Sequence, residues 1–491
     1  MTVATRITLL LLSGLLAACA VGPNYKEPSA PKTSGYAPAG QLPAATDSAS
    51  AAGGDAQRFV AGLDLQGQWW TLFQSAALND LIERGLKNNP NLQAAQASLR
   101  EANENVAAAR GSFLPSVSGS LSSTRQKSSA AAFGIPGASS LLYTLNSASL
   151  NVSYTLDAFG GVRRQVEALG AQAEYEQFSL EASYLSLTAN IVTAAINEAS
   201  YRAQISATQE IADAQQSQLD ITRRRVTAGG ASRADVLQQQ TILQATLATL
   251  PSLRNQLALQ RNLLATYVGS LPADYAAPEF TLDSISLPLD LPVSLPSKLV
   301  EQRPDVREYA ALLHESTAQI GVATANMLPQ ITLTGSVGGE AGRFADVFSS
   351  SAGVWSIAGS LTQPLFKGGQ LLHQRRAAVA AAEAADANYR ATVINAFQNV
   401  SDTLHALVSD AETLAAQDLA ERTAAESLKL VQAQYKSGAA SYLQVLNSEQ
   451  TYQNAAVALV RARAQRYADT AALFQALGGG WWNRSDVARQ M

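Results

Sequence analysis

The chain has 491 residues, of which 47% are hydrophobic and only 15% are charged, whereas an average soluble domain has about 25% charged residues. Much of the apolar share is alanine, which favours closely packed helices over a single globule. The formal net charge is −4, and a chain without a basic excess is not expected to bind nucleic acid. Its single cysteine excludes a disulfide within the chain.

The N-terminus has the pattern of a bacterial lipoprotein signal. Arg6 supplies a short positive region, and the apolar stretch 7–16 is too short for a stable membrane-spanning helix. Small residues then lead to Cys19, which resembles the cysteine that becomes the acylated first residue of such proteins. We therefore expect residues 1–18 to be a signal peptide and Cys19 to carry a covalent lipid such as palmitate. Ala20 favours the outer membrane by the same resemblance, and an ordinary secretory signal with a chance cysteine is the alternative.

The next stretch, residues 19–65, is rich in Pro, Ala, Ser and Gly and shows little periodicity. We expect it to form an extended, lipidated arm. Apolar spacing then predicts a short amphipathic helix over 78–86, and Pro90 suits the first turn of a helix that continues to about Ser112.

Two segments with period-2 alternation follow this helix. Apolar or small residues alternate with hydroxyl and amide residues over 116–122 and over 150–156, which predicts strands. Residues 123–148 between them have a loop-like composition.

A helical period then runs from Gly161 to Gly229 without a proline. At 1.5 Å per residue this predicts a helix roughly 100 Å long, for which a globular domain has no room. A returning helix is predicted from Ser232 to about Val268, with a kink at Pro251.

After a proline-rich linker the same order begins again. Arg303-Pro304-Asp305 corresponds to Asn89-Pro90-Asn91, and the alternation recurs over 331–337 and 355–362 before a second long helix at 370–437. Such an internal two-fold sequence repeat indicates a chain built twice from helix, strand, strand, long helix and returning helix. The predicted segments are the signal peptide 1–18, the arm 19–65, a first repeat 66–268, the linker 269–300, a second repeat 301–476 and a C-terminal tail 477–491.

The turns between the long and returning helices have matching sequences. Gly229 and Gly438 suit the left-handed residue that ends a helix, and Ser232 and Ser441 suit the N-cap of the next one. Gln444 stands three residues after Ser441, which completes a capping box.

The four predicted strands have one apolar face and one face of Ser, Thr and Asn. This alternation is typical of a transmembrane barrel, and about ten residues cross a bilayer when the strand is tilted. Four strands cannot close, and open edges are not tolerated in lipid. Barrels begin at about eight strands, so we expect three chains to share one barrel of about twelve. A half-buried sheet in a soluble domain is the alternative.

No catalytic pattern is found. His314, His373 and His405 are far apart in sequence, without an HExxH motif or a partner cysteine, and helix-surface positions are the simplest interpretation. No phosphate-loop pattern surrounds the glycine pairs at 160–161 and 368–369. We therefore expect no enzyme activity, no metal and no cofactor other than the lipid on Cys19.

The chain resembles the outer-membrane factor family of TolC-, OprM- and NodT-like channels. Besides the lipoprotein signal and the paired turns, the resemblance rests on Trp69-Trp70, Phe113-Leu114-Pro115, and the motifs at 363–366 and 476–482. It implies an α+β membrane protein, a homotrimer with a shared transmembrane β-barrel of four strands per chain. A long antiparallel α-helical barrel would extend from the outer membrane into the periplasm, with residues 269–300 in an equatorial belt.

The resemblance implies a passive exit duct of a tripartite efflux pump that exports small molecules such as drugs. Its partners would be outer-membrane lipid, a periplasmic adaptor (a membrane fusion protein) and an inner-membrane transporter of the RND type. A duct for type I protein secretion and a non-pore periplasmic coiled-coil lipoprotein are the alternatives, and the two matched strand pairs favour a pore. The mostly Ser, Thr, Asn and Gln lining does not identify a substrate.

The same resemblance places a gate at the periplasmic tip of the helices. Leu443 matches the constricting leucine, Gln444 and Asn447 match positions where relatives carry aspartates, and Tyr435 and Asp235 match a lock between the two hairpins. Without carboxylate rings, this gate would present only dipoles to ions. Helix capping is the alternative role for Asp235 and Gln444, and hairpin core is the alternative for Leu443.

The tip turns are also where adaptors contact channels of this family. By resemblance, the contacting residues would be Gly229 and Gly230 in the first turn and Ser437 and Gly438 in the second. The arginine that some relatives place beside the lock corresponds to Ala440 here.

Overall fold

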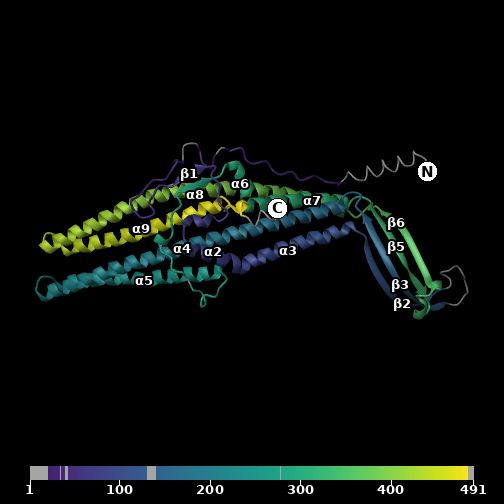
Figure 1. The fold of residues 1–491 in the computed structure, drawn as a ribbon, viewed down its shortest axis with the longest axis horizontal. Helices are drawn as coiled ribbons and strands as arrows, with labels where there is room; N and C mark the ends of the chain where they lie inside the picture. Colours follow the sequence, from purple (N-terminus) through teal and green to yellow (C-terminus); the bar gives the residue numbers. More distant parts are fainter. Residues whose placement is uncertain (1–19, 34, 39–41, 130–139, 277, 485–491) are drawn as a thin grey trace. The chain divides into compact units, whose positions relative to one another are not determined.

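The computed structural model describes residues 20–33, 35–38, 42–129, 140–276 and 278–484, so the predicted lipid site at Cys19 lies outside the described residues. The chain divides into two compact units, whose elements are labelled in Figure 1. Unit 1 comprises residues 1–28, 98–176 and 309–389, and unit 2 comprises residues 29–97, 177–308 and 390–491.

The four longest helices are much longer than any strand. The helices are α2 (Ala76–Asn88), α3 (Pro90–Arg110), α4 (Gly161–Thr227), α5 (Arg233–Tyr267), α6 (Pro296–Gln302), α7 (Pro304–Ala325), α8 (Gln370–Ser437) and α9 (Tyr442–Ala476). The strands are β1 (Arg58–Ala61), β2 (Ser116–Ser128), β3 (Leu141–Leu156), β4 (Asp290–Val293), β5 (Gln330–Ala341) and β6 (Gly353–Thr362). No helix among the described residues combines the length and the apolar character that a membrane span requires.

Unit 1 is built around an antiparallel sheet with the strand order β2-β3-β5-β6. Its two faces differ as the alternation predicts. Val337 lies opposite Trp355 on the apolar face, and these side chains are 59% and 75% exposed. On the other face, Ser336 and Ser356 share a hydrogen bond of 2.8 Å between their hydroxyls. The sheet therefore exposes a band of large apolar side chains that the described part of this chain leaves uncovered.

The first two strands of this sheet extend beyond the alternating segments. The sequence predicts strands over 116–122 and 150–156, but residues 123–128 and 141–149 also pair, ending with Ser128 opposite Leu141. The polar run of the extended part of β2 carries no apolar alternation, so its strand conformation depends on pairing with β3.

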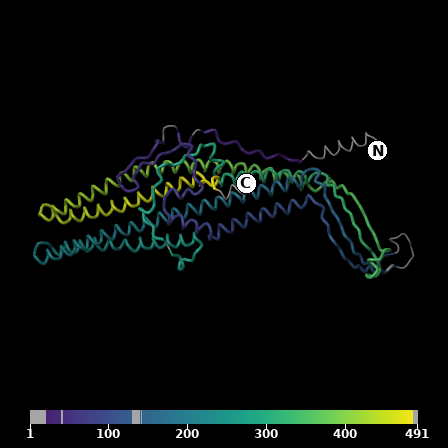
Figure 2. Tube along the Cα trace, in the orientation of Figure 1, coloured from purple at the N-terminus to yellow at the C-terminus, as the bar shows by residue number. Residues whose placement is uncertain are grey.

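Two helix pairs, α4 with α5 and α8 with α9, form most of unit 2 and are seen side by side along the chain trace in Figure 2. In the first pair, Ala212 and Leu219 of α4 pack against Leu243 of α5, and all three are almost fully buried. The small side chain of Ala212 lets the two helices approach closely at this point, and the two leucines fill the space beside it. α5 continues through Pro251, where the sequence predicts a kink.

An aromatic cluster anchors the start of unit 2 to the end of α9. Trp69 and Phe73 lie in a short 3-10 helix, Trp69–Phe73, and their ring centroids are 5.6 and 6.2 Å from that of Phe474. All three side chains are almost fully buried. The tryptophan motif that opens the ordered part of the sequence therefore belongs to the core of unit 2.

Part of the N-terminal arm is folded, which differs from the predicted extended arm. β1 pairs in parallel with β4, and the fully buried Arg466 of α9 binds the preceding loop. Its guanidinium donates to Gly53 O at 3.2 Å, Asp55 O at 2.8 Å and Thr46 Oγ1 at 2.9 Å. A buried cation needs such partners, so this arginine fixes the loop on α9.

Candidate gate at the tips of the helix pairs

The turns that end α4 and α8 have the predicted left-handed glycines. Gly229 has a φ of 74° and Gly438 a φ of 82°. The amide of Gly230 donates to Arg225 O at 2.7 Å, which is the 6→1 hydrogen bond of a Schellman motif. Ser437 is the last residue of α8, and its hydroxyl donates back into that helix. Both tips are therefore compact turns held by local hydrogen bonds.

The predicted capping boxes are present at the start of both returning helices. The amide of Ser232 donates to Asp235 Oδ2 at 2.8 Å, and the amide of Asp235 donates to Ser232 Oγ at 3.2 Å. In the second turn, the amide of Ser441 donates to Gln444 Oε1 at 2.6 Å. The polarity of Asp235 and Gln444 therefore has a structural cause within each turn.

Tyr435 joins the two helix pairs by its ring. The Arg225 guanidinium carbon of α4 lies 4.6 Å from the Tyr435 ring centroid, a cation–π distance. The ring of Tyr442, at the start of α9, lies 5.4 Å away. Among the described residues of this single chain, no hydrogen bond joins Tyr435 to Asp235. Within one chain the Tyr435 ring therefore contacts Arg225, a partner that the sequence analysis missed. The lock between Tyr435 and Asp235 stays a prediction.

The first turns of α9 have two distinct faces. Leu443 is 58% exposed and shares its face with the exposed Asn447, one turn further on. The buried side is formed by Tyr442, Val445 and Leu446, which pack against α5 and α8. Leu443 is thus not part of the hairpin core of this chain, and it lies together with Asn447 on an open helix face.

A buried polar cluster lies one to two turns behind this tip. Tyr442 donates to Gln239 Oε1 of α5, and Gln239 Nε2 donates to Gln215 O of α4 at 3.3 Å. Glu449 of α9 lies beside Gln239 and is 6% exposed, and its Oε2 has no hydrogen-bond partner among the described residues. Desolvation raises the pKa of Glu449 to about 7. No sequence signal points to this cluster, because polar residues are frequent on every helix here.

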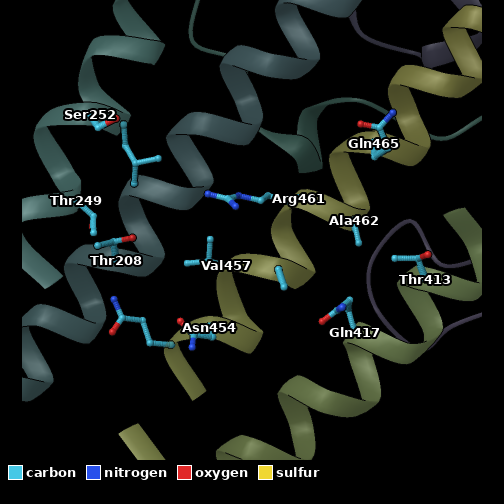
Figure 3. Close-up of a pocket in the computed structure, with 13 residues that line it drawn as sticks. Thr208, Thr249, Ser252, Thr413, Gln417, Asn454, Val457, Arg461, Ala462 and Gln465 are labelled. Carbon is cyan, nitrogen blue, oxygen red and sulfur yellow. The ribbon is translucent and has the colours of Figure 1, made fainter. Parts of the chain in front are cut away.

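Further along the same helices, an open groove of about 810 Å³ lies between the two pairs (Figure 3). Hydroxyl and amide side chains predominate among its polar lining residues, which include Thr208, Thr249 and Gln417. Arg461 is the only charged residue in this lining, and its Nε donates to Gln204 Oε1 at 2.9 Å. Within the described part of the chain, no group of three or more His, Cys, Asp or Glu residues could hold a metal ion.

Comparison with known sequences points to a single family of outer-membrane proteins. The profile of a family described as "Outer membrane efflux protein" matches residues 81–270 and 295–479. The chain is 30% identical over 490 residues to the toluene efflux pump outer membrane protein TtgC of Pseudomonas putida, covering 99% of this chain and 97% of that protein. It is 29% identical over 484 residues to nodulation protein T of Rhizobium leguminosarum bv. trifolii, covering 97% and 98%.

Solved structures show the same architecture. The outer-membrane channel OprN superposes with a TM-score of 0.84 at 27% identity, covering 94% of this chain and 100% of that one. The open state of the Neisseria gonorrhoeae MtrE outer membrane channel gives a TM-score of 0.80 at 26% identity, covering 95% and 100%. The Campylobacter jejuni CmeC channel, at 22% identity and a TM-score of 0.86 over 96% and 97%, agrees in fold.

Proposed function

Because this chain belongs to the outer membrane efflux protein family, we propose that it is the passive exit duct of a tripartite efflux pump and carries small molecules from the periplasm to the exterior. The family match extends over both halves of the chain, and OprN and MtrE are outer-membrane channels by name. The observation that carries the proposal is the two-faced sheet of unit 1. Members of this family are channels and not enzymes, so the duct itself supplies no energy.

The duct is a homotrimer with a shared barrel of about twelve strands. β2 and β6 are the edges of the four-stranded sheet and have no further partner strand among the described residues. Open edges are not tolerated in lipid, so three sheets join edge to edge and place their apolar faces outward. The hydroxyl face then lines water. The order helix, strand, strand, long helix, returning helix occurs twice, which supports an internal duplication.

The helix pairs form the periplasmic tunnel, and their tips form its gate. Leu443 constricts the tunnel, with Gln444 and Asn447 beside it, and Tyr435 and Asp235 contribute locks that bind neighbouring helices. The exposed face of Leu443 and Asn447 supports this assignment, because no described part of one chain covers it. A periplasmic adaptor contacts the turns at Gly229, Gly230, Ser437 and Gly438 and opens the gate together with an inner-membrane transporter of the RND type.

Cys19 carries a covalent lipid that anchors the chain in the outer membrane. The sequence around the cysteine and the outer-membrane location of the relatives support this proposal. Intact-mass measurement of the mature protein tests it, and an unmodified N-terminal cysteine would contradict it.

The relatives' names differ in the compounds they mention: toluene for TtgC and pyoverdine for OpmQ of Pseudomonas aeruginosa, which is 30% identical over 465 residues. The shared fold therefore serves chemically different substrates. In this chain we assign substrate choice to the transporter, since the groove and the polar face of the sheet expose mainly hydroxyl and amide groups.

Conductance in planar lipid bilayers tests the proposed duct. The wild type is expected to conduct weakly, because its gate is closed without partners. A double variant, Leu443→Ala with Tyr435→Phe, removes the apolar constriction and alters the lock, and should conduct more. A matched control, Leu419→Ala, removes an exposed leucine in the middle of α8. Absence of conductance in all three proteins would refute the duct.

A further inference from the structure

The residues directly after Cys19 are fixed on the surface of unit 1. The amide of Val21 donates to Phe159 O at 3.0 Å, just beyond the end of β3. Next to it, Gly160 has a φ of 76°, and a Cβ at this position would lie 2.6 Å from Ala20 Cα. Only glycine allows this backbone to approach so closely. The chain therefore passes the junction of β3 and α4 one residue after the predicted lipid site.

Arg164, in the first turn of α4, binds residues 21–24 of this segment. Its side chain is 4% exposed. It donates to Val21 O at 3.1 Å, to Asn24 Oδ1 at 2.6 Å and to Glu167 Oε2 at 2.7 Å. A longer contact of 3.4 Å reaches Gly22 O. If the segment left, a buried guanidinium would lose most of its acceptors, so its departure is costly.

A second contact holds the end of the segment. The ring of Tyr25 stacks on His314 of α7, with centroids 4.4 Å apart and an angle of 16° between the planes. His314 Nε2 lies 3.2 Å from Glu167 Oε1, the carboxylate that also binds Arg164. The sequence analysis assigned His314 to a helix surface, whereas here it connects α7, α4 and the N-terminal segment.

The fit of the segment also requires glycine at two positions, Gly22 and Gly321. A Cβ on Gly22 would lie 2.5 Å from Gly321 Cα, and a Cβ on Gly321 would lie 2.6 Å from Arg164 Cγ. The first neighbour is backbone and the second is the stem of the buried Arg164 side chain. Even an alanine at Gly22 or Gly321 would therefore displace the neighbouring atoms. Shape and hydrogen bonding therefore select this particular segment.

We propose that Arg164, Glu167 and His314 form an intramolecular receptor site for residues 20–25, which holds the chain directly after the acylated cysteine at the β3–α4 junction. The membrane-anchoring part of this inference rests on the proposed acylation of Cys19, whereas the receptor site rests only on the contacts of residues 20–25. The acyl chains then enter the membrane at a set point beside the end of a barrel strand. The anchor orients the unit in the membrane, instead of acting as the end of a long tether.

Hydrogen exchange of the full-length protein tests the receptor. In Arg164→Ala, the exchange of the Val21 amide should accelerate by about tenfold or more, the factor that loss of one charge-assisted hydrogen bond implies. The control Arg163→Ala removes the neighbouring arginine, whose side chain binds Asp157 and not the segment, and should leave this exchange unchanged. Equal exchange of Val21 in the wild type and Arg164→Ala would overturn the proposal.

Two further variants separate the receptor from the lipid and from misfolding. In Cys19→Ser the chain cannot be acylated, and residues 20–25 should remain protected; rapid exchange there would mean that the lipid holds the segment, which refutes the receptor. If Arg164→Ala does not fold, Tyr25→Ala is the substitute variant, because it removes the ring that stacks on His314 without changing α4 or α7. This variant should accelerate the exchange of residues 20–25 and leave the fold intact. No acceleration in Tyr25→Ala would also count against the receptor. An unmodified Cys19 by mass spectrometry refutes the anchor but not the receptor.

Discussion

Ionisation of Glu449 is expected to weaken the contact between the two helix pairs. The carboxyl is buried behind the tip, with one oxygen unpaired. The small cavity beside it is lined by Glu210 and Gln215 of α4 and by Tyr452 of α9, and contains no Lys or Arg. Among the described residues that line this cavity, no cation therefore compensates a negative charge on Glu449. The substitution Glu449→Gln keeps the size and the hydrogen-bonding groups but removes the ionisation.

The size of the effect follows from the pKa of Glu449. Burial raises it from the ordinary value of 4.5 to about 7, and at about 1.36 kcal/mol per pKa unit this corresponds to roughly 3 kcal/mol. Because the folded-state pKa is raised, the stabilisation is fully present below pH 4.5 and is lost as the pH rises through about 7. For an unfolding unit of 150–250 residues, we expect a fall in the thermal midpoint of roughly 5–10 °C.

Circular dichroism melting of the full-length protein at about pH 5 and pH 8 measures this loss. The wild type should lose several degrees more than Glu449→Gln over this interval. The control Glu210→Gln removes an exposed carboxyl at the rim of the same cavity and should behave like the wild type. If the wild type and Glu449→Gln lose the same amount, the argument from burial is wrong.

Three other predictions concern the tip and the arm. Gly438→Ala should destabilise the second turn by about 1–2 kcal/mol because its φ is 82°. The control Gly230→Ala has room for a Cβ and no positive φ, so it should melt like the wild type. If Gly230→Ala melted lower than Gly438→Ala, the left-handed role of Gly438 would be contradicted. Gln444→Asp with Asn447→Asp should increase cation selectivity in bilayer reversal potentials, and unchanged selectivity would mean that these side chains do not face the lumen. Arg466→Ala should make the arm loop around residues 46–57 sensitive to protease, and continued resistance would show that the loop is held by other contacts.

The boundaries of the long helices could be predicted because their signals are local. A left-handed glycine and a capping box are formed by residues within one turn of each other, so Gly229, Gly438, Ser232 and Ser441 identify the tips without knowledge of the packing. The alternation of the strands is equally local, since side chains of one strand alternate between two faces whatever its partner is. The family resemblance, now confirmed by the profile match, rests on such motifs.

Tertiary structure alone decided the contacts between segments that are distant in sequence. The partner of Tyr435 is Arg225, about two hundred residues earlier, and the burial of Glu449 depends on which face of α9 meets α4 and α5. The sequence records that a residue is polar, but the pKa and the hydrogen bonds of a side chain depend on the neighbours that packing brings to it. For the same reason, the sequence predicts residues 20–25 only as part of an extended arm, and packing alone places them beside Arg164 and His314.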